Sequence, residues 1–512
     1  MNHHIGATYP EQGISLVVYG ALAVLATASL IPASATAQTA PNILLVVADD
    51  LGIDAATDCY LDFSQGSEGN AASLPNIAAS ICDRGVVFEN AWAQPVCSPS
   101  RASLMTGLYA HKTNVGRVID DPADPTLAPH QGKLARHLRE VGYRTAIFGK
   151  WHLGDEGTGA TPVELGFDLF RGNLNGGVRD YDNAPYAIQD AAAADPTRVT
   201  GTGVPTVTIG GATTTYATAV QAADAVDWIA ANEATSPGSP WFAWLSYNAP
   251  HTPIHRPAES FLDRDTLAEL AACDQARGGV CEDDKVLYRA MVNAMDTLTG
   301  YVLDTIAALD DDDTIVIFVG DNGTDARYID NLYPVTAGRG KRSVYESGVR
   351  VPLAIAGPGI RERHTSAEPV HIVDLFATIV ELAEAGSPTH SYAYDDASVE
   401  IPLDSVSLIP ILSGTSETVR RGTGRYVLSE FFTGGTENVG DKAAARSDAY
   451  KVLCDGEACS SYELYDLLAD PIESNDLYEP GMEAGCASPP TEVAESFCSL
   501  REVLLARFSS GR

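Results

Sequence analysis

The sequence is poor in positive charge. Its 512 residues include 33 Lys and Arg against 68 Asp and Glu, which gives a formal net charge of −35 at pH 7. No block of like charge stands out, so the acidity is spread along the chain. A protein that binds nucleic acid needs a basic surface, and an anionic membrane attracts basic segments. The composition therefore argues against a nucleic-acid partner and against stable membrane association.

The sequence also lacks a second long apolar run. Residues 14–31 are almost all apolar or small, and Ala35-Thr36-Ala37 follows them as a small-residue cleavage site. No later stretch reaches the roughly 20 apolar residues of a spanning helix. Residues 1–13 contain no Lys or Arg, which a secretory signal normally has. We predict a signal peptide at residues 1–37 and export to the periplasm or the extracellular space; a retained membrane anchor is the alternative.

Cysteine is infrequent, and its number is odd. Pairing the cysteines that lie close in sequence gives four couples, 59/82, 273/281, 454/459 and 486/498, and leaves Cys97 over. Sequence alone does not fix this connectivity. Disulfides form in oxidising compartments, which agrees with export, and an unpaired cysteine there needs a reactive or structural reason.

The remaining composition is that of a globular protein, with 45% hydrophobic and 20% charged residues. Strand and helix patterns alternate, which favours an α/β fold around a mainly parallel sheet. The expected strands are 43–48, 144–148, 241–247, 314–320 and 351–355, and the expected helices are 132–141, 216–232, 284–309 and 372–384. Residues 155–215 are rich in Gly, Ala and Thr, and we interpret them as an insertion of loops with or without a hairpin.

The pattern changes after residue 420. Short antiparallel strands are expected at 426–432, 449–454 and 462–465, and a helix at 491–508. We therefore predict a catalytic domain at 41–420 and a smaller α+β C-terminal domain, with an antiparallel sheet and a helix, at 421–512.

Two acidic pairs follow buried strands. Asp49-Asp50 comes after an apolar run, and Asp321-Asn322 after another. In open α/β sheets the functional site lies at the carboxyl ends of the strands. Four oxygen ligands from two strand ends suit a hard divalent cation such as Ca²⁺ or Mg²⁺. The alternative is that these residues only form turns.

The most informative segment is CSPSRASLMTG, residues 97–107. Pro99 stands where a helix can begin and Gly107 where it can end. Cys97 would then lie at a helix N-terminus, where the dipole and free N–H groups favour an anion. Arg101 adds donors for a tetrahedral oxyanion. The segment is typical of an anion site that holds a nucleophile; a buried structural thiol is the alternative.

This segment resembles the signature of type I sulfatases. Other motifs of that family occur in the same order, so that the resemblance covers about residues 41–475: Asp49-Asp50, Gly149–Gly154, Gly166–Asp168, Pro250-His251, Asp321–Gly323, Gly340-Lys341, Glu346–Pro352, Glu463–Leu467, Asp470-Pro471 and Glu473. The resemblance implies an alkaline-phosphatase-like α/β sandwich with a small C-terminal domain, in agreement with the strand and helix pattern.

The resemblance also implies roles for single residues. A formylglycine-generating enzyme would oxidise Cys97 to Cα-formylglycine. Ca²⁺, with Mg²⁺ as the alternative, would be held by Asp49, Asp50, residue 97, Asp321 and Asn322. The remaining catalytic residues would be Arg101, Lys150, His152, His251 and Lys341; all but His152 would contact the sulfate or the leaving oxygen.

Lys150 and His152 are two residues apart, and on an extended segment such residues point to the same side. His152 would serve the chemistry of the aldehyde hydrate. The alternative is a strand-end lysine and a histidine with a structural partner. Ser347 stands where family members often have glycine. Asn322 begins the only glycosylation sequon, which we interpret as chance because a glycan would block the site. Arg342 we interpret as a solvated charge.

The predicted function is hydrolysis of small-molecule or glycan sulfate esters through a formylglycine hydrate. One alternative is a phosphonate or phosphate ester hydrolase on the same framework. The other is a non-catalytic binder of sulfated glycans in which residue 97 is never modified. The charge of −35 should repel densely sulfated polymers, although salt screens it, which favours aryl sulfates or lightly sulfated sugars.

Overall fold

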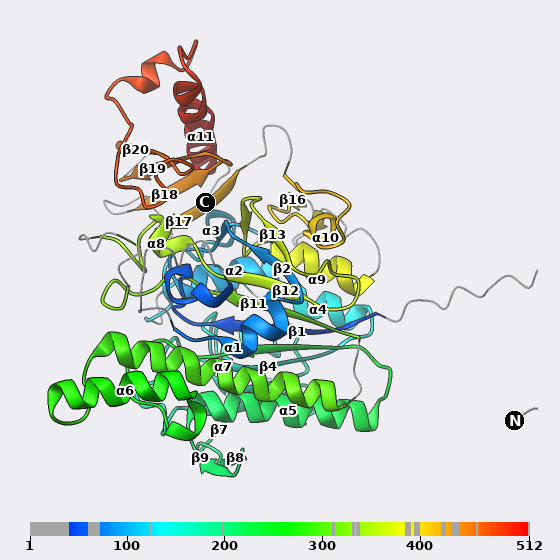
Figure 1. The fold of residues 1–512 in the computed structure, drawn as a ribbon. Coiled ribbons are helices and arrows are strands. Elements are labelled where there is room, and N and C mark those ends of the chain that lie inside the picture. The colour runs from blue at the N-terminus through cyan, green and yellow to red at the C-terminus, as the bar shows by residue number, and fades with distance from the viewer. Residues whose placement is uncertain are drawn as a thin grey trace, which may run out of the picture. The chain divides into compact units, whose positions relative to one another are not determined.

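Figure 1 shows the computed structural model of the chain. The described residues are 40–59, 72–121, 124–128, 130–196, 198–309, 313–329, 333, 338–384, 391–393, 400–420, 426–432, 441–456 and 459–509. The predicted signal peptide and its cleavage site lie outside them. Over the described ranges, we find no helix with the length and apolar character needed to cross a membrane.

A ten-stranded mixed sheet forms the centre of the fold (Figure 1). Its strands, in spatial order, are β13 (His364–Ser366), β2 (Gly85–Phe88), β12 (Leu353–Ala356), β11 (Thr314–Gly320), β1 (Asn42–Ala48), β10 (Trp241–Ser246), β4 (Arg144–Lys150), β5 (Leu169–Asn173), β6 (Tyr186–Asp190) and β7 (Thr200–Thr202). Only β12 and β6 run against the others. The prediction of an α/β fold with a mainly parallel sheet is confirmed.

The four strands that end at the motifs are neighbours. β11, β1, β10 and β4 lie side by side and are parallel, with Ala48 opposite Gly320 and Ser246 opposite Gly149. Their carboxyl ends therefore meet at one edge of the sheet, as the sequence predicted. The strand expected at 351–355 is β12, which is antiparallel to β11.

Helices cover both faces of this sheet (Figure 1). The helices are α1 (Pro75–Ile77), α2 (Cys97–Thr106), α3 (Ala110–Thr113), α4 (Leu134–Glu140), α5 (Ala217–Thr235), α6 (Arg264–Arg277), α7 (Asp284–Ala308), α8 (Glu346–Val349), α9 (Asp374–Glu384), α10 (Ile409–Leu412) and α11 (Glu492–Ser509). Along β1, Leu44 and Val46 join one core with α5 and α7, while Leu45 and Val47 join a second core with α2, α4 and α9. Burial on both faces explains why β1 is a continuous apolar run.

The insertion at 155–215 is more ordered than the sequence suggested. A hairpin is present, formed by β8 (Val207–Ile209) and β9 (Ala212–Thr214). However, β5, β6 and β7 also extend the main sheet beyond β4. The interpretation as loops with at most a hairpin is therefore wrong for these three strands.

The C-terminal part has its own antiparallel sheet. Its strands are β17 (Val427–Phe431), β18 (Lys442–Arg446), β19 (Tyr450–Asp455) and β20 (Ser461–Asp466). One face packs on α11 through Phe497 and Leu504, and the other face contacts Trp92. Two-stranded pairs elsewhere are β3 (Ala91–Trp92) with β14 (Val370–His371), and β15 (Ser391–Ala393) with β16 (Glu400–Pro402).

The four predicted disulfides are all present. They join Cys59 to Cys82, Cys273 to Cys281, Cys454 to Cys459 and Cys486 to Cys498. Cys97 has no disulfide partner and is buried. The odd cysteine is therefore the one in the signature segment.

His371 predicts a pH dependence of stability. Burial, reinforced by Arg420, lowers its pKa from 6.5 to about 3, and its Nδ1 accepts the N–H of Val373 at 3.0 Å. The unfolded chain then binds a proton between pH 6.5 and 3 that the folded chain does not, so stability falls as pH drops through this window. Between about pH 7.5 and 4.5 this residue costs about 2–3 kcal/mol.

The variant His371→Asn keeps an acceptor for Val373 but does not titrate. The measurement is the free energy of unfolding in urea at about pH 7.5 and at about pH 4.5. For this variant, we expect the difference between the two values to be about 2–3 kcal/mol smaller than for the parent. Because the readout is a difference, a pH-independent cost of the substitution cancels. An unchanged difference would show that His371 is not the proton-linked group.

Candidate active site

The two acidic pairs meet at the edge of the sheet. The N–H of Asp321 donates to the carbonyl of Ala48 at 3.0 Å, and the N–H of Asp50 donates to Asp321 Oδ1 at 3.2 Å. Asn322 Nδ2 donates to Asp50 Oδ1 at 2.9 Å. Asp49, Asp50, Asp321 and Asn322 are all buried. Parallel pairing of β1 and β11 therefore brings together two motifs that are about 270 residues apart.

Each buried carboxylate has its own buried cation. Lys150 Nζ lies 2.6 Å from Asp49 Oδ2 and Lys341 Nζ lies 2.5 Å from Asp50 Oδ1. Arg101 Nη2 lies 2.8 Å from Asp321 Oδ2. Three negative charges are thus balanced by three positive charges. Loss of one partner would leave an uncompensated buried charge, which typically costs about 3–5 kcal/mol.

Two oxygens of this cluster have no donor. Asp49 Oδ1 and Asn322 Oδ1 are buried and receive no hydrogen bond from the part of the chain that the structure describes. Buried oxygens without a partner are costly, and carboxylate and amide oxygens are the ligands that Ca²⁺ and Mg²⁺ take. The residues therefore fit a hard divalent cation. Burial of Asn322 also leaves no room for a glycan on the folded protein.

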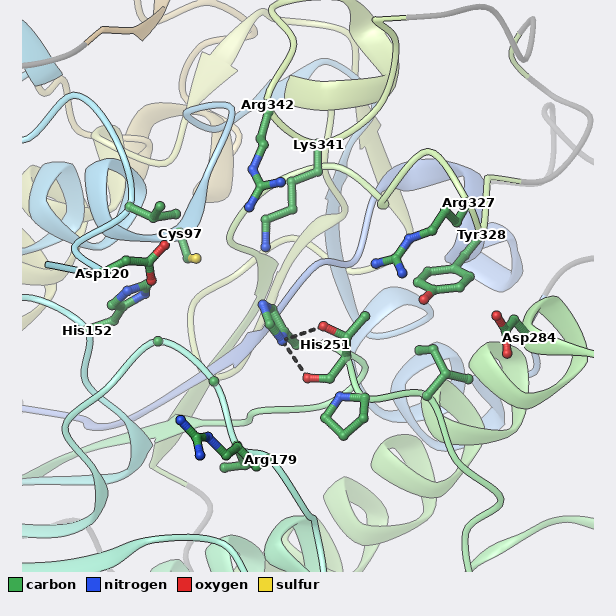
Figure 2. Close-up of a pocket in the computed structure, with 17 residues that line it drawn as sticks. Cys97, Asp120, His152, Arg179, His251, Asp284, Arg327, Tyr328, Lys341 and Arg342 are labelled. Atoms are coloured by element: carbon green, nitrogen blue, oxygen red, sulfur yellow. Dashed lines mark hydrogen bonds between the residues drawn. The ribbon is translucent and has the colours of Figure 1, made fainter. Parts of the chain in front are cut away.

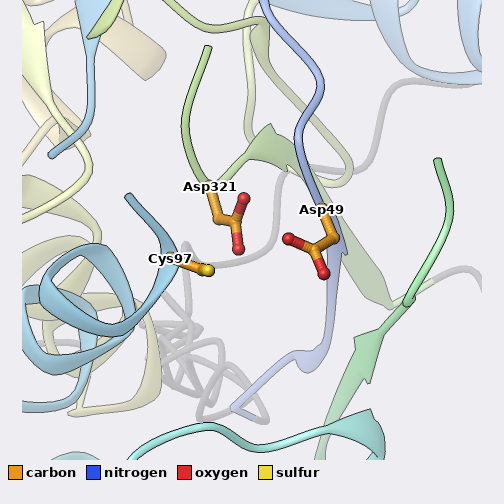
Figure 3. Close-up of side chains that lie close together, drawn as sticks. All are labelled: Asp49, Cys97 and Asp321. Carbon is orange, nitrogen blue, oxygen red and sulfur yellow. The ribbon is translucent and has the colours of Figure 1, made fainter. Parts of the chain in front are cut away.

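Cys97 is the first residue of α2, as the sequence predicted, and Gly107 ends this helix with φ at 71°. Figure 3 shows its sulfur facing the carboxylates of Asp49 and Asp321, and the three ligand atoms lie within 4.8 Å of one another. Burial opposes ionisation of the thiol, but Lys150 and Lys341 outweigh burial and lower its pKa. Cys97 is thus placed beside the candidate cation site.

Arg101 lies behind Asp321 rather than on the cavity wall. Its Nε and Nη2 donate to Asp321 Oδ2 at 3.0 and 2.8 Å, and its Nη1 donates to the carbonyl of Lys150 and to Ser246 Oγ. A guanidinium with these partners has little capacity left for a substrate. The geometry favours a positioning role for Arg101 over the sulfate contact expected from the sequence.

His152 reaches the site by a different geometry from the one expected. Strand β4 ends at Lys150, and His152 has φ at 63°, so the argument from an extended segment is wrong. Its Nε2 lies 3.2 Å from the carbonyl of Ile119, and its Nδ1 is buried without a partner among the described residues. Burial, with Lys150 and Arg101 nearby, lowers its pKa well below 6.5. The ring is therefore held neutral, with a free acceptor nitrogen when Nε2 carries the proton.

His251 follows β10 and points into the cavity (Figure 2). Its Nδ1 lies 2.8 Å from the carbonyl of Thr252, to which it donates, and its Nε2 lies 3.8 Å from Asp50 Oδ2. The backbone contact fixes the ring, so that Nε2 is the nitrogen available for proton exchange.

Lys341 lies on a loop that hydrogen bonds and an ion pair hold in place. Its N–H donates to the carbonyl of Thr324 at 2.9 Å, and the N–H of Gly340 donates to Ser347 Oγ at 2.9 Å. The neighbouring Glu346 pairs with Lys451 at 3.0 Å, which ties this loop to the C-terminal sheet. Ser347, the departure from the family pattern, thus supports Lys341 through its hydroxyl.

A cavity of about 680 Å³ opens above these groups (Figure 2). Its wall includes Cys97, His152, His251 and Lys341, so the structure brings four predicted site residues to one space. Asp49, Asp50, Asp321, Asn322, Lys150 and Arg101 form the layer beneath. The wall also contains residues that sequence reasoning missed or assigned to solvent: Asp120, Gly176, Gly177, Arg179, Asp284, Arg327, Tyr328 and Arg342.

Gly176 lies directly on a site histidine. A Cβ at this position would lie 2.3 Å from Nε2 and Cε1 of His152, and one at Gly177 would lie 3.3 Å from Cε1 of His251. The variant Gly176→Ala should displace the His152 ring from the Ile119 carbonyl. A misplacement of about 1 Å can cost about 100-fold in rate, and we expect a loss of kcat of that order with the melting temperature little changed.

The matched control is Gly201→Ala in the same insertion, where an added Cβ meets nothing within 4 Å. This variant should keep the kcat of the parent. Equal activity of both variants would mean that the Gly176 contact does not position His152.

A family model described as Sulfatase matches residues 41–385, and one described as N-sulphoglucosamine sulphohydrolase, C-terminal, matches residues 339–488. Arylsulfatase J of Mus musculus is 28% identical over 371 residues, which are 69% of this chain and 54% of the mouse protein. Choline-sulfatase of Rhizobium meliloti is 27% identical over 482 residues, 86% of this chain and 82% of that protein.

Solved structures share the fold. The crystal structure of Ps i-CgsB in complex with k-i-k-neocarrahexaose has a TM-score of 0.65 at 23% identity, and the match covers 92% of this chain and 97% of the other. The expected architecture, an α/β core with a small C-terminal antiparallel sheet, is confirmed by this match.

Proposed function

Because the chain belongs to the sulfatase family, we propose that it hydrolyses sulfate monoesters by S–O cleavage through formylglycine formed from Cys97. The observation that carries this proposal is the position of residue 97. The only described cysteine without a disulfide begins α2, lies within 4.8 Å of the ligand atoms of Asp49 and Asp321, and lines the cavity with His152, His251 and Lys341.

The first step is attack on sulfur. The hydrated aldehyde at residue 97 carries two hydroxyl groups, of which one attacks the sulfur atom and gives its proton to Asp321. Burial raises the pKa of Asp321, which makes it a better proton acceptor. The bond between sulfur and the ester oxygen breaks, and His251 or Lys341 protonates the leaving oxygen. Sulfate is then bonded to residue 97.

The second step releases sulfate. His152 takes the proton of the remaining hydroxyl, the aldehyde reforms, and the bond between the carbon and the sulfate oxygen breaks. A water molecule then restores the hydrate. A sulfate ester of an ordinary serine or cysteine has no second hydroxyl on the same carbon, so it cannot release sulfate in this way. Because burial lowers the pKa of His152, its ring is uncharged near neutral pH and has a nitrogen lone pair available for this proton.

The donor set fits Ca²⁺, with Mg²⁺ as the alternative. Asp49, Asp50, Asp321, Asn322 and the oxygen of residue 97 would hold the ion. When bound, it would supply positive charge that offsets negative charge on the sulfuryl oxygens. Lys150 and Lys341 add fixed positive charge on the protein side of the same space.

The substrate is an aryl or a carbohydrate sulfate in this proposal. Similarity to an arylsulfatase supports the first class, and the fold shared with Ps i-CgsB, whose structure is in complex with k-i-k-neocarrahexaose, agrees with the second. A phosphate or phosphonate ester is the second candidate, since the same groups can serve phosphorus. Release of sulfate and of phosphate from matched aryl esters separates the two candidates.

We also propose export, a catalytic domain at 41–420 and a C-terminal domain at 421–512. Four disulfides among the described residues support an oxidising compartment. The antiparallel sheet from β17 to β20 with α11 supports the division near residue 420.

The first experiment is the mass of the tryptic peptide Gly85–Arg101 from protein produced in its native host. Loss of one sulfur and two hydrogens with gain of one oxygen identifies formylglycine, and sulfate release from 4-nitrophenyl sulfate or a sulfated sugar then tests the activity. An unmodified Cys97 in protein that nevertheless releases sulfate would overturn the mechanism.

A further inference from the structure

We propose that the cavity holds a second anionic group of the substrate between Arg179 and Arg342, so that the preferred substrates are sulfate esters with a further sulfate or carboxylate. This inference rests on the proposed function, because it places the reacting sulfate at residue 97. It adds the chemical class of the rest of the substrate.

The two arginines lie on the cavity wall with nothing to neutralise them. Arg342 follows Lys341 directly, and Figure 2 shows its guanidinium beside the Lys341 side chain, while Arg179 comes from another side of the same space. Both residues are exposed. Neither side chain has an ion pair or a hydrogen bond with any residue in the described ranges, although each lines the pocket that contains Cys97.

The other basic groups of the wall differ in this respect. Arg327 donates to both carboxylate oxygens of Asp325, at 3.0 and 3.1 Å. Lys341 is paired with Asp50. The uncompensated positive charge of the cavity therefore resides on Arg179 and Arg342. The fork of donors on a guanidinium matches the oxygens of a sulfate or carboxylate.

The backbone of Arg342 gives an independent indication. Its φ is 73°, in the left-handed region that favours glycine, and its N–H donates to the carbonyl of Pro95 at 2.8 Å. A side chain in this conformation costs free energy that glycine would not, and such residues concentrate at ligand sites. An arginine here is explained when its side chain contacts a ligand.

The charge on the cavity wall favours anionic substrates, whereas the net charge of the whole chain disfavours them. A net charge of −35 repels polyanions at long range, but screening limits this to about 8 Å at physiological salt. Within the cavity, Asp120 lies beside His152 and Asp284 beside Tyr328, away from the two free arginines (Figure 2). A volume of about 680 Å³ is within the range that holds a drug-sized or sugar-sized ligand.

The test compares pairs of substrates that differ by one anionic group. A monosulfated sugar and the same sugar with a second sulfate form one pair, and a phenyl sulfate with and without a ring carboxylate forms the other. We expect the parent enzyme to favour the member with two anions by at least about 10-fold in kcat/KM, and more so at low salt.

Two substitutions probe the arginines. Arg179→Ala removes an exposed side chain, and Arg342→Gly removes the other while relieving the backbone, so the folded state is retained and is checked by its melting temperature. Each should lower the preference for the second anion by about 10-fold, through KM rather than kcat. Arg327→Gln should have a smaller effect, because Arg327 is already paired.

The control is Arg264→Ala, an exposed arginine on α6 outside the cavity, which removes the same net charge. It should leave the preference unchanged. Absence of a preference in an enzyme that turns over single sulfates, or an equal loss on both members of each pair, would overturn this inference alone. A parent with formylglycine at residue 97 that hydrolyses no sulfate ester would overturn the proposed function and this inference with it.

Discussion

The variant Cys97→Ala is expected to lose at least about 10⁴-fold in kcat/KM for sulfate esters, since removal of a covalent nucleophile typically costs that much or more. Neither Asp321 nor His152 has a proton to accept when residue 97 has no hydroxyl. The remaining groups of the site can still bind the ester, so binding of a sulfated ligand should persist.

The fold of this variant should be retained. Cys97 is buried and has no disulfide partner, and alanine is well tolerated in the first turn of a helix. The loss of one sulfur atom from a buried position should cost about 1 kcal/mol. Circular dichroism and the melting temperature verify this expectation.

The matched control is Ser103→Ala in the same helix. Ser103 is buried, and its hydroxyl has no hydrogen-bond partner within the described residues. This variant makes a similar change in volume without touching residue 97, and it should keep most of the parent activity. Turnover by Cys97→Ala at the parent rate would contradict formylglycine catalysis.

The strands that end at the active site were predictable because their apolar composition indicates that they are buried. β1 is apolar at every position that faces either core, and the acidic pairs after β1 and β11 have no place in such a core. Adjacent parallel strands then required the pairs to meet. The position of Cys97 at the start of α2 was predictable from Pro99 and Gly107 in the same way.

Other features carried no such signal. β18 has the sequence KAAAR, which has low strand propensity, and it is a strand because β17 and β19 lie on either side. His152 reaches the site because its own backbone has a positive φ, and the residues around it in the sequence do not indicate this conformation. Gly176 and Arg179 come from an insertion whose strands have only three to five residues each, so its place beside the site depends on tertiary packing.

Removal of divalent metal is expected to lower kcat by about 10³-fold or more, because a bound cation supplies several kcal/mol of charge stabilisation to such reactions. Dialysis of matured protein against a chelator, followed by addition of Ca²⁺ or Mg²⁺, measures the loss and its recovery. The ion should also stabilise the fold, since a ligand at 100 times its Kd adds about 2.7 kcal/mol. We expect the melting temperature to rise by about 3 °C or more at this concentration and to increase further with the logarithm of the free Ca²⁺ concentration.

Asn322→Ala tests the place of the ion. It removes the unpaired oxygen Oδ1 and one 2.9 Å hydrogen bond to Asp50. The Ca²⁺ concentration at which half of the activity is recovered, the Ca²⁺ midpoint, should therefore be higher than for the parent. Asn232→Ala removes a buried amide on α5 that does not line the cavity, and it should lower stability without moving that midpoint. If added Ca²⁺ does not change the melting temperature of the parent protein, the cation site is contradicted.

The charge balance of the cluster adds a second expectation. Asp49, Asp50 and Asp321 are already matched by Lys150, Lys341 and Arg101, so a bound dication leaves two positive charges in excess. A sulfate dianion in the cavity would cancel this excess. Coupling between sites is reciprocal, so inorganic sulfate should lower the Ca²⁺ midpoint, and Ca²⁺ should tighten sulfate binding by the same factor. Independent binding of the two ions, measured by calorimetry, would place the cation away from the anion site.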